Sequence, residues 1–214
     1  MKGCMKSLIS DPTRRRVLQG TLASAFVLGA APAFALSEAE ARKLIDSVVG
    51  DINRAINSGK TGSALYRDFE TIFRKYADVP TIARSVLGPP ARSASKAQMA
   101  AFTDAFTGYL SRKYGKRFND FKGSQIEVTG ARQVKSFQEV RATAKLRGQS
   151  PFTVIFMVSD RSGRDKFFDL LIEGISLLKA ERSEVGAMLD RAGGNVDKLV
   201  VELKRKAYSA SSLH

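Results

Sequence analysis

Cysteine, histidine and tryptophan are almost absent from the 214 residues of this chain. Cys4 is the one cysteine, His214 is the one histidine, and there is no tryptophan. One cysteine cannot form a disulfide within the chain. His214 ends a short polar tail that has little to pack against, so the sequence offers no positioned imidazole to act as a general base, to bind a metal or to activate a nucleophile. The commonest catalytic arrangements are therefore excluded, although a carboxylate such as Asp169 or Glu173 could still supply an acid.

Acidic residues are also scarce. The chain has 21 of them against 35 lysines and arginines, which gives a formal charge of +14. A surplus of this size attracts anionic partners, and both nucleic acid and lipid headgroups fit that description. Charge alone does not separate the two.

An export signal is predicted at the N-terminus. The basic segment Thr13 to Arg16 precedes an apolar run, Val17 to Ala31, and Ala33-Phe34-Ala35 then matches the pattern that signal peptidase cleaves. The apolar run is interrupted by polar residues and is shorter than the ~20 residues of a membrane-spanning helix. We therefore expect cleavage after Ala35. The arginines fit the twin-arginine route in part, and the general secretory route stays open.

Loss of residues 1–35 has two consequences for the mature chain. It removes Cys4, five basic residues and one acidic residue, so the formal charge falls from +14 to +10 and no thiol chemistry is left. It also places the protein in the periplasm, away from nucleic acid. Lipid headgroups and acidic protein surfaces remain as partners for the basic surface.

Six helices are predicted from apolar residues at helical spacing. Ser37 with Glu40, and Ser95 with Gln98, form capping boxes that mark two helix starts. The predicted helices run from Ser37 to about Ser58, over Leu65–Tyr76, over Pro80–Leu87, from Ser95 past Leu110, over Glu181–Ala192 and over Asn195–Ala207.

From Gln125 onward the apolar spacing changes to two, which predicts strands. Four are expected, around Ile126–Val128, Val140–Leu146, Phe152–Val158 and Phe168–Ile172. Their short connections favour an antiparallel meander. The expected fold is α+β, a four-stranded antiparallel sheet covered on one face by several helices, in a single domain over residues 36–208 followed by a disordered tail at 209–214.

The fourth predicted strand has an unusual end. Phe168, Leu170 and Ile172 share one face, Phe167 falls on the other, and the apolar face finishes at Gly174, which has no side chain. Two explanations are open. The backbone turns or bulges at Gly174, or a ligand occupies the volume that a side chain would have filled.

The apolar face of the predicted sheet mixes large residues with the small Ala142 and Ala144. In a close-packed core, small residues lie opposite large ones. If helix residues such as Phe102, Phe106 and Leu110 do not reach across, a ligand cavity remains between sheet and helices. A filled core and a cavity are both compatible with the sequence.

Several segments match a known family in order and spacing. They are Asp78 to Gly88 (DVPTIARSVLG), Gln98-x-x-x-Phe102 followed by Phe106, Leu110 and Tyr114, then Asp169, Ile172 to Leu177 (IEGISL) and Arg182. Together these segments resemble the MlaC or toluene-tolerance family of periplasmic phospholipid-binding proteins, over essentially the whole mature chain. The departures lie at Pro89-Pro90, at Lys166 to Phe168 and at Glu181 to Val185, where the family often has other residues. These departures leave the identity of the bound lipid open, and a hopanoid-associated branch of the family is a candidate.

The resemblance implies a carrier without catalytic activity or cofactor. It would take the acyl chains of a phospholipid into an apolar pocket and shuttle the lipid between an outer-membrane lipoprotein complex and an inner-membrane ABC transporter. The pocket residues expected on this basis are Phe102, Phe106, Leu110, Tyr114, Val140, Ala142, Ala144, Phe156, Val158, Leu170, Ile172 and Gly174. Enlarging one of them, as in Ala144→Phe, is then expected to weaken lipid binding with the fold preserved.

Three alternatives remain beside the phospholipid carrier. A hopanoid-type lipid could be the cargo, an α+β enzyme could use Asp169 or Glu173 in its pocket, or the domain could be a ligand-free periplasmic adaptor with a filled core.

Overall fold

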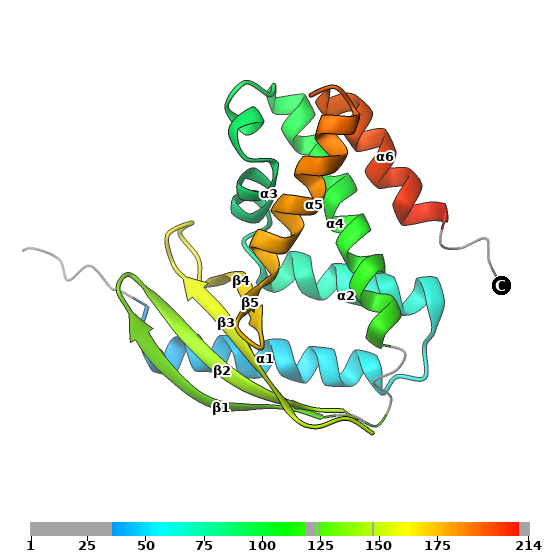
Figure 1. Ribbon diagram of the computed structural model, residues 1–214. Helices are drawn as coiled ribbons and strands as arrows, with labels where there is room; N and C mark the ends of the chain where they lie inside the picture. Colours follow the sequence, from blue (N-terminus) through cyan, green and yellow to red (C-terminus); the bar gives the residue numbers. More distant parts are fainter. Residues whose placement is uncertain (1–35, 119–122, 124, 147, 210–214) are drawn as a thin grey trace, which may run out of the picture. The chain divides into compact units, whose positions relative to one another are not determined.

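The computed structural model describes residues 36–118, 123, 125–146 and 148–209 (Figure 1). The predicted export signal and the residues after Ser209 lie outside this description. Within the described residues the fold is α+β, as predicted, with six α-helices and a five-stranded antiparallel sheet. The helices are α1 (Glu38–Ile56), α2 (Gly62–Tyr76), α3 (Val79–Leu87), α4 (Lys96–Phe118), α5 (Leu177–Arg191) and α6 (Val196–Ser209), and a 3-10 turn, η1 (Pro89–Arg92), precedes α4. The strands are β1 (Gln125–Val134), β2 (Phe137–Lys145), β3 (Phe152–Ser159), β4 (Lys166–Ile172) and β5 (Ile175–Ser176).

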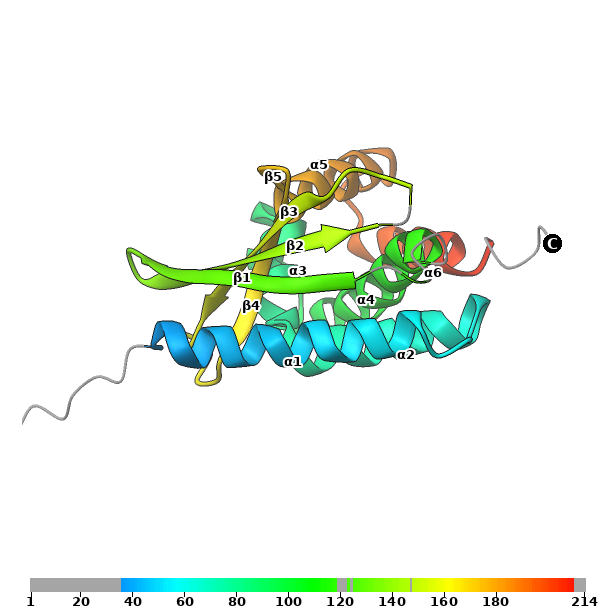
Figure 2. The same ribbon diagram turned by 90° about the horizontal axis from the view of Figure 1, so that it is seen from below.

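The sheet is a meander in which each strand pairs with its sequence neighbour, in the order β1-β2-β3-β4-β5. The predicted four strands are β1 to β4, and the fifth is a two-residue addition. Along β2 the buried residues alternate with more exposed ones, as the sequence predicts. The buried face is turned toward the helices, and α1 runs along it, in contact with β1, β2 and β3 (Figure 2).

Polar side chains of α1 bind the backbone of the edge strand β1. Asn53 donates to the carbonyl of Ile126 at 3.2 Å and accepts from its amide at 3.3 Å. Arg42 donates to the carbonyl of Val128 at 3.2 Å. An edge strand normally presents free backbone groups that can pair with another chain. Here α1 occupies several of them.

The two predicted capping boxes are present. The amide of Glu40 donates to Ser37 Oγ at 3.2 Å, and the amide of Ser37 donates to Glu40 Oε2 at 3.0 Å. The amides of Gln98 and Ser95 make the same reciprocal pair at the start of α4, each at 3.1 Å. These local bonds satisfy donors that a helix start leaves free, which is why the sequence alone located both starts.

Helix α5 begins at Leu177, four residues before the predicted start at Glu181. Ser176 caps it by accepting from the amide of Lys179 at 3.1 Å, and Asp169 on β4 accepts from the amide of Leu178 at 2.9 Å. The second cap comes from a strand, so local periodicity does not reveal it.

A register shift between Met157 and Val158 brings Phe167 onto the same face of β4 as Leu170. Leu170 pairs with Phe156 and Phe167 pairs with Val158, two residues farther along β3, whereas simple alternation placed Phe167 and Leu170 on opposite faces. Phe167 is only 4% exposed, and its ring meets those of Phe156 and Phe73 at centroid distances of 5.8 Å and 6.0 Å. The prediction for Phe167 is wrong because a bulge cannot be read from alternation.

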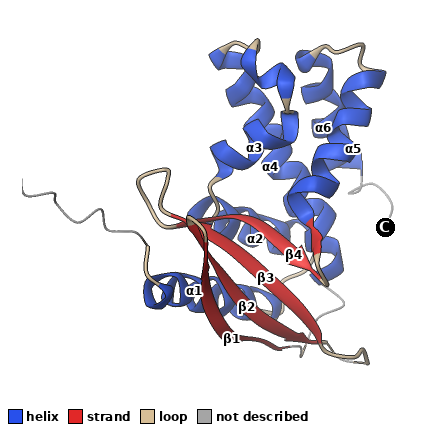
Figure 3. Cartoon of the chain, turned by 60° about the vertical axis from the view of Figure 1, so that its left-hand side comes forward, coloured by secondary structure: helices blue, strands red, loops and turns tan. Residues whose placement is uncertain are grey.

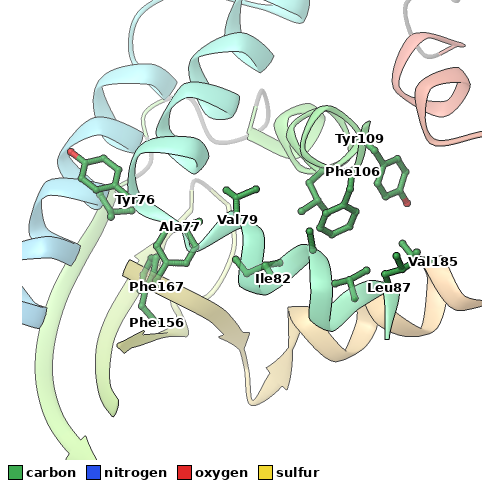
Figure 4. Packing of buried hydrophobic residues seen from close by; sticks show 14 of the residues in the cluster. Tyr76, Ala77, Val79, Ile82, Leu87, Phe106, Tyr109, Phe156, Phe167 and Val185 are labelled. Atoms are coloured by element: carbon green, nitrogen blue, oxygen red, sulfur yellow. The ribbon is translucent and has the colours of Figure 1, made fainter. Parts of the chain in front are cut away.

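Phe167 also joins the sheet to the helices. Its carbonyl accepts from the amide of Asp78 at 2.8 Å, and it forms an isolated parallel bridge with Ala77, between α2 and α3. Figure 4 shows Ala77 and Phe156 beside Phe167, with Val79 and Ile82 of α3 following. The corner between α2 and α3 is thus fixed to β4 by main-chain bonds.

Gly174 lies in a tight turn between β4 and β5. Glu173 and Gly174 both have positive φ, +49° and +79°, and Ile172 pairs with Ile175 across them, which is the pattern of a two-residue hairpin turn. Gly174 is exposed, and a Cβ there would meet nothing within 4 Å. Of the two explanations for Gly174, the structure supports the turn.

Helices α3 to α6 pack chiefly on one another and extend beyond the sheet (Figure 3). The most extensive helix–helix contact is α4 with α6, followed by α2 with α4 and then α3 with α5. The stacked rings of Phe102 and Phe106, 5.6 Å apart, lie on the buried side of α4. None of the described helices combines the length and the apolar character needed to cross a membrane.

Candidate functional site

An apolar pocket with a cavity volume of about 190 Å³ lies between the sheet and the helices. Its wall is built by five helices and two strands and is almost entirely hydrocarbon. The helical residues are Val48 and Ile52 of α1, Phe69, Ile72 and Phe73 of α2, Ile82 and Val86 of α3, Phe106, Leu110, Ser111, Tyr114 and Gly115 of α4, and Leu177, Leu178 and Glu181 of α5. The strand residues are Phe156 of β3 and Phe167, Phe168, Asp169, Leu170 and Ile172 of β4.

Helical spacing explains how each helix lines the pocket. Val48 and Ile52 are four residues apart on α1, as are Phe69 and Phe73 on α2, so each pair projects from one face of its helix. Ile52 and Phe73 are only partly buried although both pack against the core. Partly buried large apolar side chains facing a common space make a surface suited to an apolar ligand.

Half of the predicted pocket residues line this cavity. They are Phe106, Leu110 and Tyr114 of α4, Phe156 of β3, and Leu170 and Ile172 of β4. They come from the two regions that were expected to face each other, the aromatic stripe of the long helix and the apolar strand residues.

The other six predicted residues do not line it. Gly174 lies in the exposed turn, and the remaining five are closely packed in the core: Phe102, Val140, Ala142, Ala144 and Val158. Strand β2 is covered by α1, so its small residues Ala142 and Ala144, at 0% and 2% exposure, lie beneath a helix rather than beside the cavity. The filled-core arrangement holds at this part of the sheet, and the cavity lies farther along, at β3 and β4.

The wall residues of α1, α2, α3 and α5 were not among the predicted ones. The sequence feature that could have indicated them is an excess of large apolar residues beyond those needed for the buried face of each helix. Phe69, Ile72 and Phe73 on α2 are an example. Nothing local distinguishes a side chain that faces a cavity from one that faces the core. Only the arrangement of the elements separates them.

Asp169 is one of two carboxylates in the wall, and both of its oxygens accept hydrogen bonds from nearby residues of the chain. Its Oδ1 accepts from the amides of Leu170 and Leu178 at 2.8 Å and 2.9 Å, and its Oδ2 accepts from Ser176 Oγ at 2.6 Å. Glu173, the other acid considered for catalysis, is exposed and accepts from the amide of Thr153 at 2.5 Å. Both acids hold the β4–β5 corner together, so neither is free to act on a ligand.

The second carboxylate, Glu181, belongs to a polar cluster on α4 and α5. Its Oε1 accepts from Lys113 Nζ at 2.6 Å and from Tyr114 Oη at 2.5 Å. Lys113 Nζ also donates to Glu184 Oε2 at 2.5 Å, and Tyr109 Oη donates to Glu184 Oε1 at 2.5 Å. The cluster contains two carboxylates and one ammonium group.

The charges in this cluster shift the pKa values of its members. Burial lowers the pKa of Lys113, but the hydrogen bonds to Glu181 and Glu184 outweigh it, so the pKa is raised overall. Burial raises the pKa of Glu184, but the bonds from Lys113 and Tyr109 leave it below the ordinary value. Burial, and then the bond to Glu184, raise the pKa of Tyr109 well above its usual range. Lys113 is therefore charged and Tyr109 neutral at physiological pH.

The pocket can bind but has little with which to react. Ser111 Oγ donates to the carbonyl of Thr107 at 2.8 Å. In the part of the chain that the structure describes, no three His, Cys, Asp or Glu side chains are grouped to hold a metal ion. The apolar wall is suited to burying a hydrocarbon group.

Comparison with known proteins agrees with this geometry. A family model described as "MlaC protein" matches residues 42–205. Among solved structures, the chain is similar to a phospholipid-binding protein from Ralstonia solanacearum, determined in complex with a phospholipid. The TM-score is 0.69 at 18% sequence identity, and the match covers 80% of this chain and 99% of the other.

Proposed function

This chain belongs to the MlaC family, and from that membership and its apolar pocket we propose that it is a periplasmic lipid carrier. It binds the acyl chains of a phospholipid between β3–β4 and the helices. It transfers the lipid between an outer-membrane lipoprotein complex and an inner-membrane ABC transporter, after export by its N-terminal signal. The carrier performs no chemical conversion.

The physical need for such a carrier is large. Burying one methylene is worth about 0.8 kcal/mol, so two chains with about thirty methylenes represent over ~20 kcal/mol against water. A bare lipid cannot cross an aqueous compartment at that cost. A bilayer solvates the same chains equally well, so a pocket of hydrocarbon side chains lets lipid pass between membrane and protein with a small net change in free energy.

The observation that carries the proposal is the composition of the pocket wall. Large apolar side chains from seven elements face one space and leave it unfilled. Cavities of about 150 Å³ with such linings stay dry and admit benzene-sized ligands, so about 190 Å³ accommodates part of one acyl chain. A complete phospholipid therefore requires the wall to widen as the chains enter.

The bound phospholipid in the Ralstonia solanacearum protein supports the same cargo here. The departures of this chain at Glu181 to Val185 keep a hopanoid-type lipid as an alternative cargo. The formal charge of +10 that remains without residues 1–35 suits contact with acidic partner proteins or anionic headgroups.

Native mass spectrometry tests the proposal. The full chain is expressed with its own N-terminus in a bacterium that exports it, purified from the periplasm without detergent, and analysed together with an organic extract. We expect one lipid per protein, identified by fragmentation as a phospholipid or a hopanoid. A periplasmic protein that is empty, and that stays empty after incubation with phospholipid vesicles, would instead support the adaptor.

A further inference from the structure

Among the residues that the structure describes, one oxygen of Glu181 has no hydrogen-bond partner. The residue is 2% exposed, and its Oε1 takes both donors that reach it, from Lys113 and Tyr114. Its Oε2 is buried and accepts nothing. Glu181 lines the pocket, so this oxygen belongs to a side chain in the wall of the lipid site.

Buried acceptors of this kind are rare because they lose their water without replacement. The penalty is greater for a charged group than for a neutral one. Asp169, on the same wall, shows the usual solution, since three donors from its own chain reach its two oxygens. Glu181 has donors on one side only, and they come from α4, which fixes the carboxylate and leaves the other oxygen without a protein partner.

We propose that Oε2 of Glu181 accepts a hydrogen bond from the ligand, and that the site selects apolar molecules whose polar group is a donor, a hydroxyl or an ammonium. This inference rests on the proposed carrier function and specifies its cargo further. No donor from the described part of the protein reaches this acceptor. An alkyl chain that brings a donor to this depth removes that penalty, and a chain without a donor does not.

The charges of the cluster define what is excluded. Glu181 shares its one hydrogen-bonded cation, Lys113, with Glu184. A phosphate or carboxylate beside Glu181 would place two like charges together in a poorly solvated place. The anionic part of a lipid therefore stays away from Glu181, and the donor that meets Oε2 belongs to another part of the molecule.

Matched single-chain probes test the inference. The purified full-length protein, stripped of lipid, is loaded with N-phenyl-1-naphthylamine, and displacement of that dye is measured with 1-tetradecanol, tetradecylamine and methyl tetradecyl ether. The alcohol and the amine carry donors, and the ether carries an acceptor alone. We expect the alcohol to bind about tenfold more tightly than the ether, the scale of satisfying one buried acceptor. The amine arm shows whether an ammonium is also accepted.

Glu181→Gln is the diagnostic variant, and Glu184→Gln is its matched control. In Glu181→Gln the amide oxygen keeps accepting from Lys113 and Tyr114, and the amide nitrogen replaces Oε2 as a donor. The preference for the alcohol over the ether should disappear, because both probes can accept from that nitrogen. Glu184 does not line the pocket. Its replacement should leave the preference in place.

The comparison of alcohol and ether on wild-type protein tests the inference even if the Glu181→Gln variant does not fold. Equal affinity of wild-type protein for alcohol and ether, with both displacing the dye, overturns the inference and leaves the carrier function standing. A preference that survives in Glu181→Gln also overturns it. If no probe displaces the dye and no lipid co-purifies, the carrier function fails, and the inference fails with it.

Discussion

Asp51 shows how a single residue joins two helices of the pocket wall. Its carboxylate lies on α1 and accepts from Tyr76 Oη at 2.7 Å and from Lys75 Nζ at 3.1 Å, both at the end of α2. Arg54 pairs with it from its own helix. The bond from Tyr76 is the largest cause that holds the pKa of Asp51 below its ordinary value, with burial acting in the opposite direction.

Replacing Tyr76 by Phe should destabilise the protein by about 1.5–3 kcal/mol, the range for a hydrogen bond between a neutral and a charged group. Urea unfolding at neutral pH measures this loss. The exposed acid Asp46, whose pair with Arg42 is 3.9 Å long, supplies the control, and Asp46→Asn should change little. Equal stability of Tyr76→Phe and the wild type would show that the bond to Asp51 contributes nothing.

The same variant should change the response to acid. Because the folded pKa of Asp51 lies below its unfolded value, its contribution is present above the ordinary pKa near 3.8 and is lost as pH falls through the lowered folded value. In Tyr76→Phe the folded pKa should rise toward 3.8. An NMR titration of the Asp51 carboxyl carbon measures the shift, and an unchanged midpoint would contradict this explanation.

Among the elements, the β4–β5 hairpin depends on a glycine in the left-handed region. An alanine at position 174 would keep φ near +79°, at a cost of roughly 1 kcal/mol, although nothing crowds its Cβ. We expect Gly174→Ala to lose about that much stability and to keep its lipid content. Gly186, in α5 and also uncrowded, is the control, since alanine there should be neutral or stabilising. A loss of lipid in folded Gly174→Ala would restore the idea that this residue leaves room for acyl chains.

The position of Ala144 on β2 changes the expected effect of Ala144→Phe. The sequence predicts weaker lipid binding with the fold preserved, whereas the structure predicts a loss of stability. Ala144 is 2% exposed beneath α1 and is not part of the pocket wall. A phenyl group there overpacks the core, so we expect a loss of about 1–3 kcal/mol in the free energy of unfolding. Guanidinium unfolding measures it. Full stability with reduced lipid content would show that position 144 faces the cavity after all.

The elements also show what the sequence could and could not predict. Helix starts at Ser37 and Ser95 depend on residues three apart, and the alternation along β2 depends on neighbours two apart, so local patterns located them correctly. The start of α5 is capped locally by Ser176 and also by Asp169 on β4, a contact that helical spacing does not show. The position of Phe167 depends on a bulge opposite Val158, which simple alternation does not show.

In the candidate site, too, some residues could be predicted from local patterns and others could not. Phe106, Leu110, Leu170 and Ile172 could be predicted, because a long aromatic helix and an apolar strand were expected to face each other. The contributions of α1 and α2, and the role of Glu181, could not. They depend on where helices cross the sheet, which side-chain periodicity does not determine.

At the scale of the whole molecule, the pocket should respond to filling. Ile172 lines the cavity, whereas Ile175, its partner across the hairpin, is 68% exposed and is not part of the pocket wall. An indole at position 172 occupies much of about 190 Å³, so Ile172→Trp should co-purify with far less lipid than the wild type. Ile175→Trp should carry the normal amount. Lipid extraction of both proteins checks this, and normal loading of Ile172→Trp would place the lipid outside this cavity.

The neighbour-to-neighbour order of the sheet also bears on how the chain reaches its native state. Because β1 to β5 each join the strand that follows, every pairing closes a short loop and the entropic cost of assembling the sheet is low. The demanding step is the arrival of α1 on β1, since Asn53 and Ile126 are 73 residues apart. A newly unfolded chain can thus form its hairpins at once, while the edge strand remains open to other chains until that first helix seals it.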